Sequence, residues 1–109
     1  MAWLLRDGEV LAALEIAESR RARRRGLLGR DSFEGALLLR PARSVHSIGM
    51  RFAIDVAFCD ADLVVLSALG LRPNRITRTR WKAHSVIEAS SGAFERWGLR
   101  PGDQLEIEG

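Results

Sequence analysis

The residue types best suited to chemistry lie close together in one segment, residues 46–55, which reads HSIGMRFAID. Histidines such as His46 change charge near neutral pH, and arginines such as Arg51 keep a fixed positive charge. Asp55 adds a carboxylate that could orient either cation, and Gly49 would let a ligand or another backbone come close. An apolar run follows at once, so we expect these polar groups at the entrance of a buried strand.

This segment predicts a ligand site lined by His46, Met50, Arg51 and Asp55, with the loop at residues 72–81 as its rim. The ligand would be small and polar or anionic, because Arg51 and the arginines of the loop attract negative charge. The protein would then be a non-catalytic accessory or ligand-binding module. A purely structural interpretation stays open, in which the same side chains satisfy the strand entrance and Asp55 is paired with Arg51, His46 or backbone amides.

A second hypothesis is a small enzyme in which His46 is the general base and Asp55 orients it. The sequence shows no nucleophile that accompanies this pair. The chain has only two histidines and one cysteine, without the spacings of common metal sites, and it lacks the usual phosphate-binding glycine motifs. The sequence therefore predicts no metal and no cofactor.

Two clusters of basic residues suggest a third hypothesis, a polyanion binder. They lie at residues 20–25 and 72–82 and hold ten of the 17 basic residues, although the net charge is only +3. Such clusters attract nucleic acid. Arginine outnumbers lysine sixteen to one, a bias that also fits a G+C-rich genome. A solvated surface is therefore the favoured interpretation, and nucleic acid is the less favoured partner.

Length and composition fit one globular domain over residues 1–109, large enough to bury a core without a disulfide. The single cysteine, Cys59, lies in an apolar run and is expected to be a small buried hydrophobe in a reducing compartment. Near the N-terminus, Arg6 and Asp7 interrupt the apolar residues before they reach the length of a signal peptide or a membrane span. We expect a cytoplasmic protein.

Alternating apolar residues and turn formers predict the strands that must position the site. Strands are expected at residues 3–5, 9–16, 35–40, 53–59, 63–69, 85–89 and 103–108. The first two should form a hairpin through Asp7-Gly8, although alanine and leucine leave a helix open at 9–16. The strands at 53–59 and 63–69 are apolar on both faces, so both should lie centrally in the sheet.

Two short helices complete the predicted elements. One spans residues 20–25, from an N-cap at Ser19 to Gly26, and the other spans residues 93–97, capped by Ser90 or Ser91 and ended by Gly98. The predicted fold class is mainly β (α+β), a compact antiparallel β sandwich or barrel with two short helices.

Several segments, in this order and spacing, resemble a bacterial and archaeal family known as domain of unknown function 192. The resemblance runs from about residue 14 to 106 and rests on RRGLLGR (24–30), HSIGMRFAIDVAFCD (46–60), the apolar strand at 63–66, VIEASSG (86–92) and GLRPGDQL (98–105). It implies a mostly antiparallel β sandwich or barrel with short helices, and it implies no established activity.

The positions that match the family's own motifs include the predicted site residues: His46, Gly49, Met50, Arg51, Asp55 and Gly102-Asp103. The chain departs from the family in two places. Its first helix is almost purely arginine where relatives mix acidic and basic residues, and the turn after Phe58 lacks their frequent glycine. Many relatives look exported, so the resemblance leaves localisation open.

Overall fold

The computed structural model describes residues 1–109 as seven strands and two short helices. The strands are β1 (Ala2–Arg6), β2 (Glu9–Ala17), β3 (Ala36–Leu39), β4 (Ile54–Cys59), β5 (Val65–Leu71), β6 (Ser85–Ser90) and β7 (Leu105–Glu108); the helices are α1 (Arg20–Arg25) and α2 (Ala93–Trp97). Neither helix is long and apolar enough to cross a membrane.

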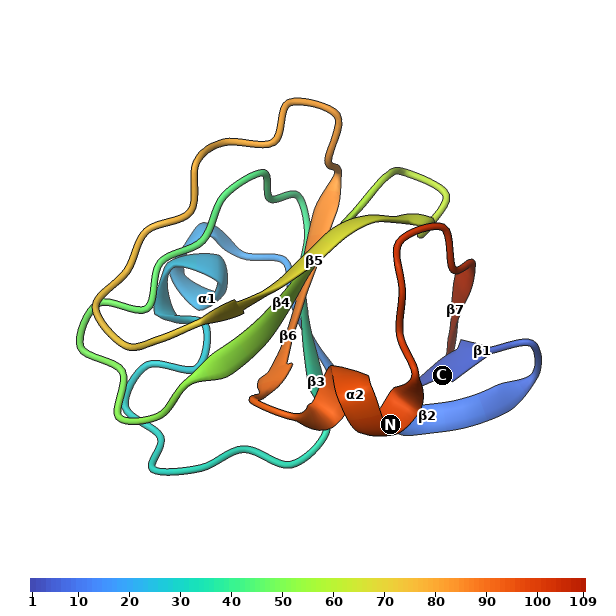
Figure 1. Cartoon of the computed structure of the whole chain (residues 1–109), viewed down its shortest axis with the longest axis horizontal. Helices are drawn as coiled ribbons and strands as arrows, with labels where there is room; N and C mark the ends of the chain where they lie inside the picture. The colour runs from blue at the N-terminus through green and yellow to red at the C-terminus, as the bar shows by residue number, and fades with distance from the viewer.

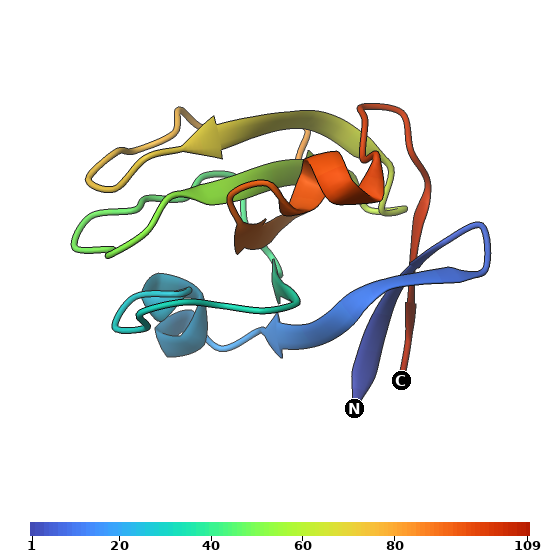
Figure 2. The same cartoon turned by 60° about the horizontal axis from the view of Figure 1, so that its bottom comes forward.

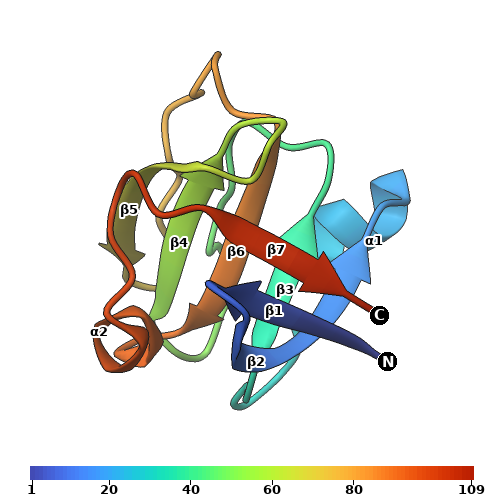
Figure 3. The same cartoon turned by 90° about the vertical axis from the view of Figure 1, so that its right-hand side faces the viewer.

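All seven strands belong to one sheet, in the order β5-β4-β6-β3-β2-β1-β7. The sheet curls into a half-barrel, so that β1 and β7 lie to the right of the central strands in Figure 1 and cross in front of them in Figure 3. Neighbouring strands run antiparallel, except that β2 and β3 run parallel. The prediction of a mainly β fold with two short helices is confirmed.

The hairpin between β1 and β2 forms where Asp7-Gly8 predicts it. Both residues adopt a positive φ, 53° for Asp7 and 79° for Gly8, as tight hairpin turns with the twist of the sheet require. Leu4 and Leu14, on the two strands, are both buried in the core. The segment with the alternating pattern at 9–16 is therefore a strand and not a helix.

The central strands β3, β4 and β6 carry almost only buried residues, because both faces of the sheet are covered. One face packs a cluster of 13 buried residues around Leu38, Ile87 and Phe94. The other face packs a cluster of 12 buried residues around Phe58 and Val86. This second cluster lies next to the site described below.

The prediction that both β4 and β5 are central is correct for β4 and wrong for β5, which is an edge strand. Five of its seven residues are partly buried or exposed. The first residues of β5 are apolar because the segment before β7 covers them. The amide of Val65 donates to the carbonyl of Asp103 over 2.9 Å, and the amide of Gly102 donates to the carbonyl of Val65 over 2.7 Å. These bonds join the two ends of the sheet at one corner, as the near approach of β5 and the C-terminal segment in Figure 2 illustrates.

Helix α1 is capped as predicted. The hydroxyl of Ser19 accepts a hydrogen bond from the amide of Ala22 at 3.0 Å, and Gly26 ends the helix with a φ of 50°. No residue of the helix itself is buried, but Leu27, which follows the capping Gly26, lies in the second apolar cluster. The chain therefore anchors this arginine-rich helix through a residue just beyond its cap.

Helix α2 is capped differently from the prediction. Its N-cap position is Gly92, and the side chain of Ser90 instead donates to the carbonyl of Phe33. The cap comes from β4, where Asp55 Oδ2 accepts hydrogen bonds from the amides of Gly92 and Phe94, both at 3.0 Å. The predicted serine cap is wrong because a carboxylate that is distant in sequence occupies this place.

Candidate functional site

The structure does not gather the four predicted site residues around one cavity. His46 is half-buried beside Ile76, and its Nδ1 accepts a hydrogen bond from the amide of Ile48 at 3.2 Å. Asp55 is engaged with α2, and no hydrogen bond or ion pair joins it to His46. The two residues line different pockets.

The other two predicted residues also lie in separate environments. Met50 is buried in the second apolar cluster. Arg51 is exposed and forms an ion pair with Asp31, whose side chain is more exposed still. Exposed pairs of this kind contribute little to stability.

The predicted rim, the loop at 72–81, does lie against the His46 segment. The amide of Ser47 donates to the carbonyl of Arg75 over 2.8 Å, and the amide of Asn74 donates to Ser47 over the same distance. Asn74 Oδ1 accepts from the amide of Gly49 at 2.9 Å. The two loops therefore form one hydrogen-bonded unit around Ser47, the residue that follows His46.

His46 faces a cavity of about 320 Å³ between the end of α1 and the segment that follows β3. Most of its lining is polar or charged. The charged and titratable residues among the lining are Arg23, Arg24, Arg25, Arg43, His46 and Glu88.

Glu88 is the unusual member of this set, because it is only 2% exposed. It lies in the middle of β6, opposite Leu37 on β3 and Val56 on β4, so its neighbours in the sheet are apolar. Its Oε1 has no hydrogen-bond partner. Burial raises the pKa of Glu88 to about 7. An unpartnered buried carboxyl is costly to keep and is typical of functional sites.

Gly26 brings the end of α1 directly over this carboxyl. A Cβ atom at position 26 would lie only 3.1 Å from Glu88 Oε1, and the φ of 50° also disfavours a side chain there. None of the arginines that line the cavity forms an ion pair with a carboxylate. The cavity thus combines guanidinium groups that have no carboxylate partner with one buried acid, Glu88, whose pKa lies near neutral pH.

Glu88 is not among the site residues that the sequence predicts, although the sequence contains a sign of it. Residues 85–89, SVIEA, form a buried strand in which Glu88 is the single charged residue. A charge at such a position needs a partner or a function.

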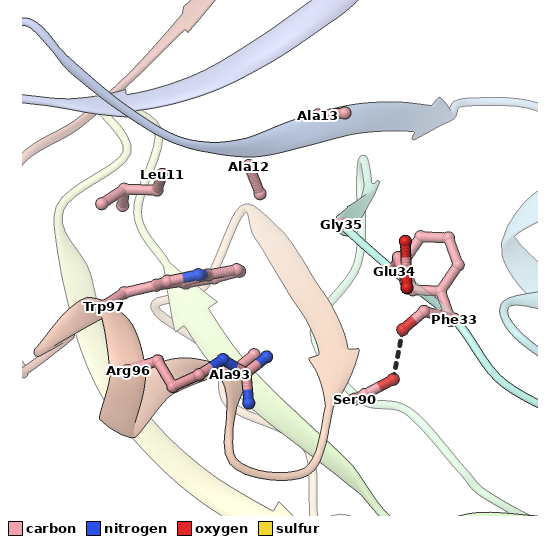
Figure 4. Close-up of a pocket in the computed structure, with 10 residues that line it drawn as sticks. All are labelled: Leu11, Ala12, Ala13, Phe33, Glu34, Gly35, Ser90, Ala93, Arg96 and Trp97. Carbon is pink, nitrogen blue, oxygen red and sulfur yellow. Dashed lines mark hydrogen bonds between the residues drawn. The ribbon is translucent and has the colours of Figure 1, made fainter.

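A larger cavity, of about 540 Å³, lies between β2, residues 33–35 and α2 (Figure 4). Trp97 and Leu11 line one end of it, and the Ser90–Phe33 hydrogen bond closes the other. No unpartnered buried polar atom faces this cavity. No cluster of three or more metal-ligating side chains is present in the structure.

The sequence model of the domain of unknown function 192 family, described as "Uncharacterized ACR", matches residues 2–107. The chain belongs to this family. The UPF0127 protein PF1050 of Pyrococcus furiosus is 35% identical to it over 63 residues, which span 58% of this chain and 54% of that relative. The resemblance predicted from the motifs is therefore confirmed.

Two crystal structures share the fold of this domain of unknown function 192 member. One is a protein of unknown function from Novosphingobium aromaticivorans, with a TM-score of 0.81 and 19% identity, covering 96% of this chain and 82% of that one. The other is a candidate transcription regulator from Sinorhizobium meliloti, with a TM-score of 0.83 and 20% identity, covering 97% and 91%. At these identities the likeness shows the half-barrel fold alone.

Proposed function

We propose that this protein is a small-molecule binding module whose ligand occupies the cavity between α1 and the segment after β3. The observation that carries the proposal is the unpartnered carboxyl of Glu88 in the wall of that cavity. Cavities of roughly 300 Å³ or more with a few convergent polar groups are the usual form of a metabolite site.

The lining supports one class of ligand. Arg24, Arg25 and Arg43 offer guanidinium groups without carboxylate partners, which suit a phosphate or carboxylate group. Glu88 needs a hydrogen-bond donor, and an ammonium group would satisfy it best. The ligand is therefore a small molecule that carries an anionic group at one end and an amine or hydroxyl donor at the other.

The enzyme hypothesis takes a different form from the one predicted. Asp55 is engaged with α2, whereas Glu88 lines the same cavity as His46. A proton-transfer enzyme at this place would use His46 and Glu88 as its titrating pair. We favour binding without catalysis, because no nucleophile lines the cavity apart from the hydroxyl of Ser44.

Two probes that differ by one group test the proposed function. Phosphoethanolamine carries both a phosphate and an amine, whereas inorganic phosphate carries the anionic group alone. Titrations followed by backbone amide NMR are expected to show tighter binding of phosphoethanolamine, with shifts at Gly26, Arg43 and His46. In Glu88→Gln the advantage of phosphoethanolamine over phosphate should be lost, because the neutral amide no longer pairs with an ammonium group.

The arginines provide the second arm of this experiment. The double variant Arg24→Gln and Arg25→Gln should weaken both probes, while the exposed Arg100→Gln, outside the cavity lining, should leave both unchanged. The proposal would be overturned if the native protein bound both probes with equal affinity. It would also be overturned if Arg100→Gln lost as much affinity for the probes as the double variant.

A further inference from the structure

Charge is strongly segregated along this chain. Residues 19–30, 35–54 and 63–87 contain no aspartate or glutamate, yet they hold fourteen of the 17 basic residues. All 14 carboxylates lie in the remaining segments. The modest net charge of +3 therefore conceals strongly basic segments that alternate with acidic ones along the chain.

The fold brings the parts of these segments that carry the basic residues to one end of the molecule. Helix α1 and the long loops before β4 and before β6 lie together, away from α2 and β7 (Figure 1). The two loops are joined by the bond from the Arg80 amide to the Arg43 carbonyl at 2.8 Å, and the cavity joins Arg43 to the end of α1. We call this surface, formed by residues 19–30, 40–53 and 72–84, the basic face.

Few of these cations are neutralised. Only Arg30, Arg40 and Arg51 of the basic face pair with a carboxylate. The remaining arginines and the one lysine have no carboxylate within 4.0 Å. Such a surface attracts polyanions and releases their counterions on binding.

One large aromatic side chain stands out on this face. Trp81 is 78% exposed and lies between Arg80 and Lys82. The chain before it is held firmly, because the guanidinium of Arg80 lies over the ring of Phe58 at 4.6 Å and its Nη1 donates to the carbonyl of Arg78. On the other side, the amide of Ala83 donates to the carbonyl of Arg80. Trp81 is thus presented to solvent on an ordered loop.

We infer that the basic face binds single-stranded nucleic acid, with Trp81 as a stacking platform for a base. A track of cations beside an exposed aromatic ring is the combination by which proteins hold single strands without sequence preference. A duplex keeps its bases stacked on one another, so it could use the arginines but not Trp81. This inference goes beyond the proposed small-molecule site and uses a side chain outside that cavity.

An anionic membrane is the competing partner for a basic face with exposed apolar residues. Ile48 and Ile76 are also exposed on these loops. Arg78 and Arg80 lie between Ile76 and Trp81 along the chain, so cations alternate with the exposed apolar residues of this loop. The arrangement favours bases stacked between cations over insertion into lipid.

Fluorescence anisotropy with a labelled 12-nucleotide oligothymidylate tests this inference. We expect binding at low salt that weakens steeply as salt rises. Trp81→Ala should lower the affinity by roughly 5- to 160-fold, the range of one lost base–aromatic stack. Trp3→Ala, which removes a partly exposed tryptophan from β1, should leave affinity unchanged. Thermal melts of both variants establish that they are folded.

Three results would overturn the inference. The first is that the oligonucleotide does not bind at low salt. The second is that the single strand and a duplex bind with equal affinity and Trp81→Ala has no effect. The third is that the protein binds phosphatidylserine vesicles but not the oligonucleotide. Glu88→Gln separates this test from the small-molecule test. It should leave oligonucleotide binding intact even where it abolishes the preference for phosphoethanolamine.

Discussion

Asp55 on β4 accepts a hydrogen bond from the backbone amide of Phe94, 3.0 Å away, and so caps a helix that begins far along the chain. A helix of five residues has too few internal hydrogen bonds to persist alone. Its other end is held by Arg6 of β1, whose guanidinium donates to the carbonyls of Trp97 and Gly98. Side chains from two distant strands therefore fix α2 at both ends.

Replacing Asp55 should destabilise the fold through this cap. We expect Asp55→Ala to lower the free energy of unfolding by about 1–3 kcal/mol, because it leaves the amides of Gly92 and Phe94 without their acceptor. Asp55→Asn keeps an uncharged acceptor and should cost about half as much. Urea denaturation measures both losses.

His46→Ala is the matched comparison for the Asp55 variants. His46 is half-buried and makes one side-chain hydrogen bond to the backbone, so the loss should stay below about 1 kcal/mol. A large loss for both residues would mean that His46 serves the structure and not a binding site.

Arg6 also contacts Asp103, and this contact can be followed by titration. The amide of Arg100 and, after it, the guanidinium of Arg6 hold the pKa of Asp103 below its usual value of 3.8. Asp103 therefore stabilises the fold above that pH, and this stabilisation is lost as the pH falls through its lowered value. Arg6→Gln should raise the pKa of Asp103 part of the way back, because the Arg100 amide still donates to it.

Carboxyl NMR shifts followed from pH 2 to 6 measure this change. Arg30→Gln, which breaks the separate and more exposed pair with Glu15, serves as the control and should leave Asp103 unchanged. An unaltered titration of Asp103 in Arg6→Gln would show that the ion pair is absent in solution.

Cys59 should be unreactive in the folded protein. It is fully buried at the end of β4, and burial, together with the nearby charge of Asp60, raises the pKa of its thiol to about 12. A thiol reagent at pH 8 is expected to label it only as fast as the protein unfolds, and denaturant should accelerate the reaction. Rapid stoichiometric labelling of the native protein would place the end of β4 at the surface.

Local features of this fold could be predicted, and long-range ones could not. The Asp7-Gly8 hairpin and the helix from Ser19 to Gly26 depend on neighbouring residues, so their turn and capping residues identify them. The edge position of β5 depends on which segments meet across the sheet. Hydrophobicity alone could not reveal it, because an apolar strand suits either an interior position or a corner covered by another segment.

The candidate site shows the same difference between local features, which the sequence predicts, and long-range contacts, which it does not. The sequence identified Asp55 as a carboxylate in need of a partner, and backbone amides were among the predicted partners. That these amides belong to α2, and so take Asp55 away from His46, depends on the register of β4 with β6. Glu88 could have been identified from the sequence, since it is the one charged residue in the strand at 85–89. The cavity that it lines could not be predicted, because that cavity depends on where α1 packs.

The strongest prediction concerns the pH dependence of stability at Glu88. Its pKa is about 7 in the folded protein, against an ordinary value of 4.5, so the native state holds more protons than the unfolded state between these values. The free energy of unfolding therefore falls as the pH rises through this window, by on the order of 3 kcal/mol from this group. Glu88→Gln has nearly the same shape and cannot ionise. It should be more stable than the native protein at pH 8 and should lose that advantage by pH 4.5.

Urea denaturation of the two proteins from pH 4.5 to 8.5 measures this difference directly, because the other titrating groups are common to both. Glu106→Gln on the exposed side of β7 is the control, and its difference from the native protein should stay nearly constant with pH. A constant difference for Glu88→Gln as well would mean that Glu88 has an ordinary pKa, and that a partner or water already satisfies it. In that case the cavity would lose the group on which its proposed selectivity for a donor depends. A gain in stability at pH 8 would instead mark Glu88 as a residue kept at the expense of stability, as binding sites often require.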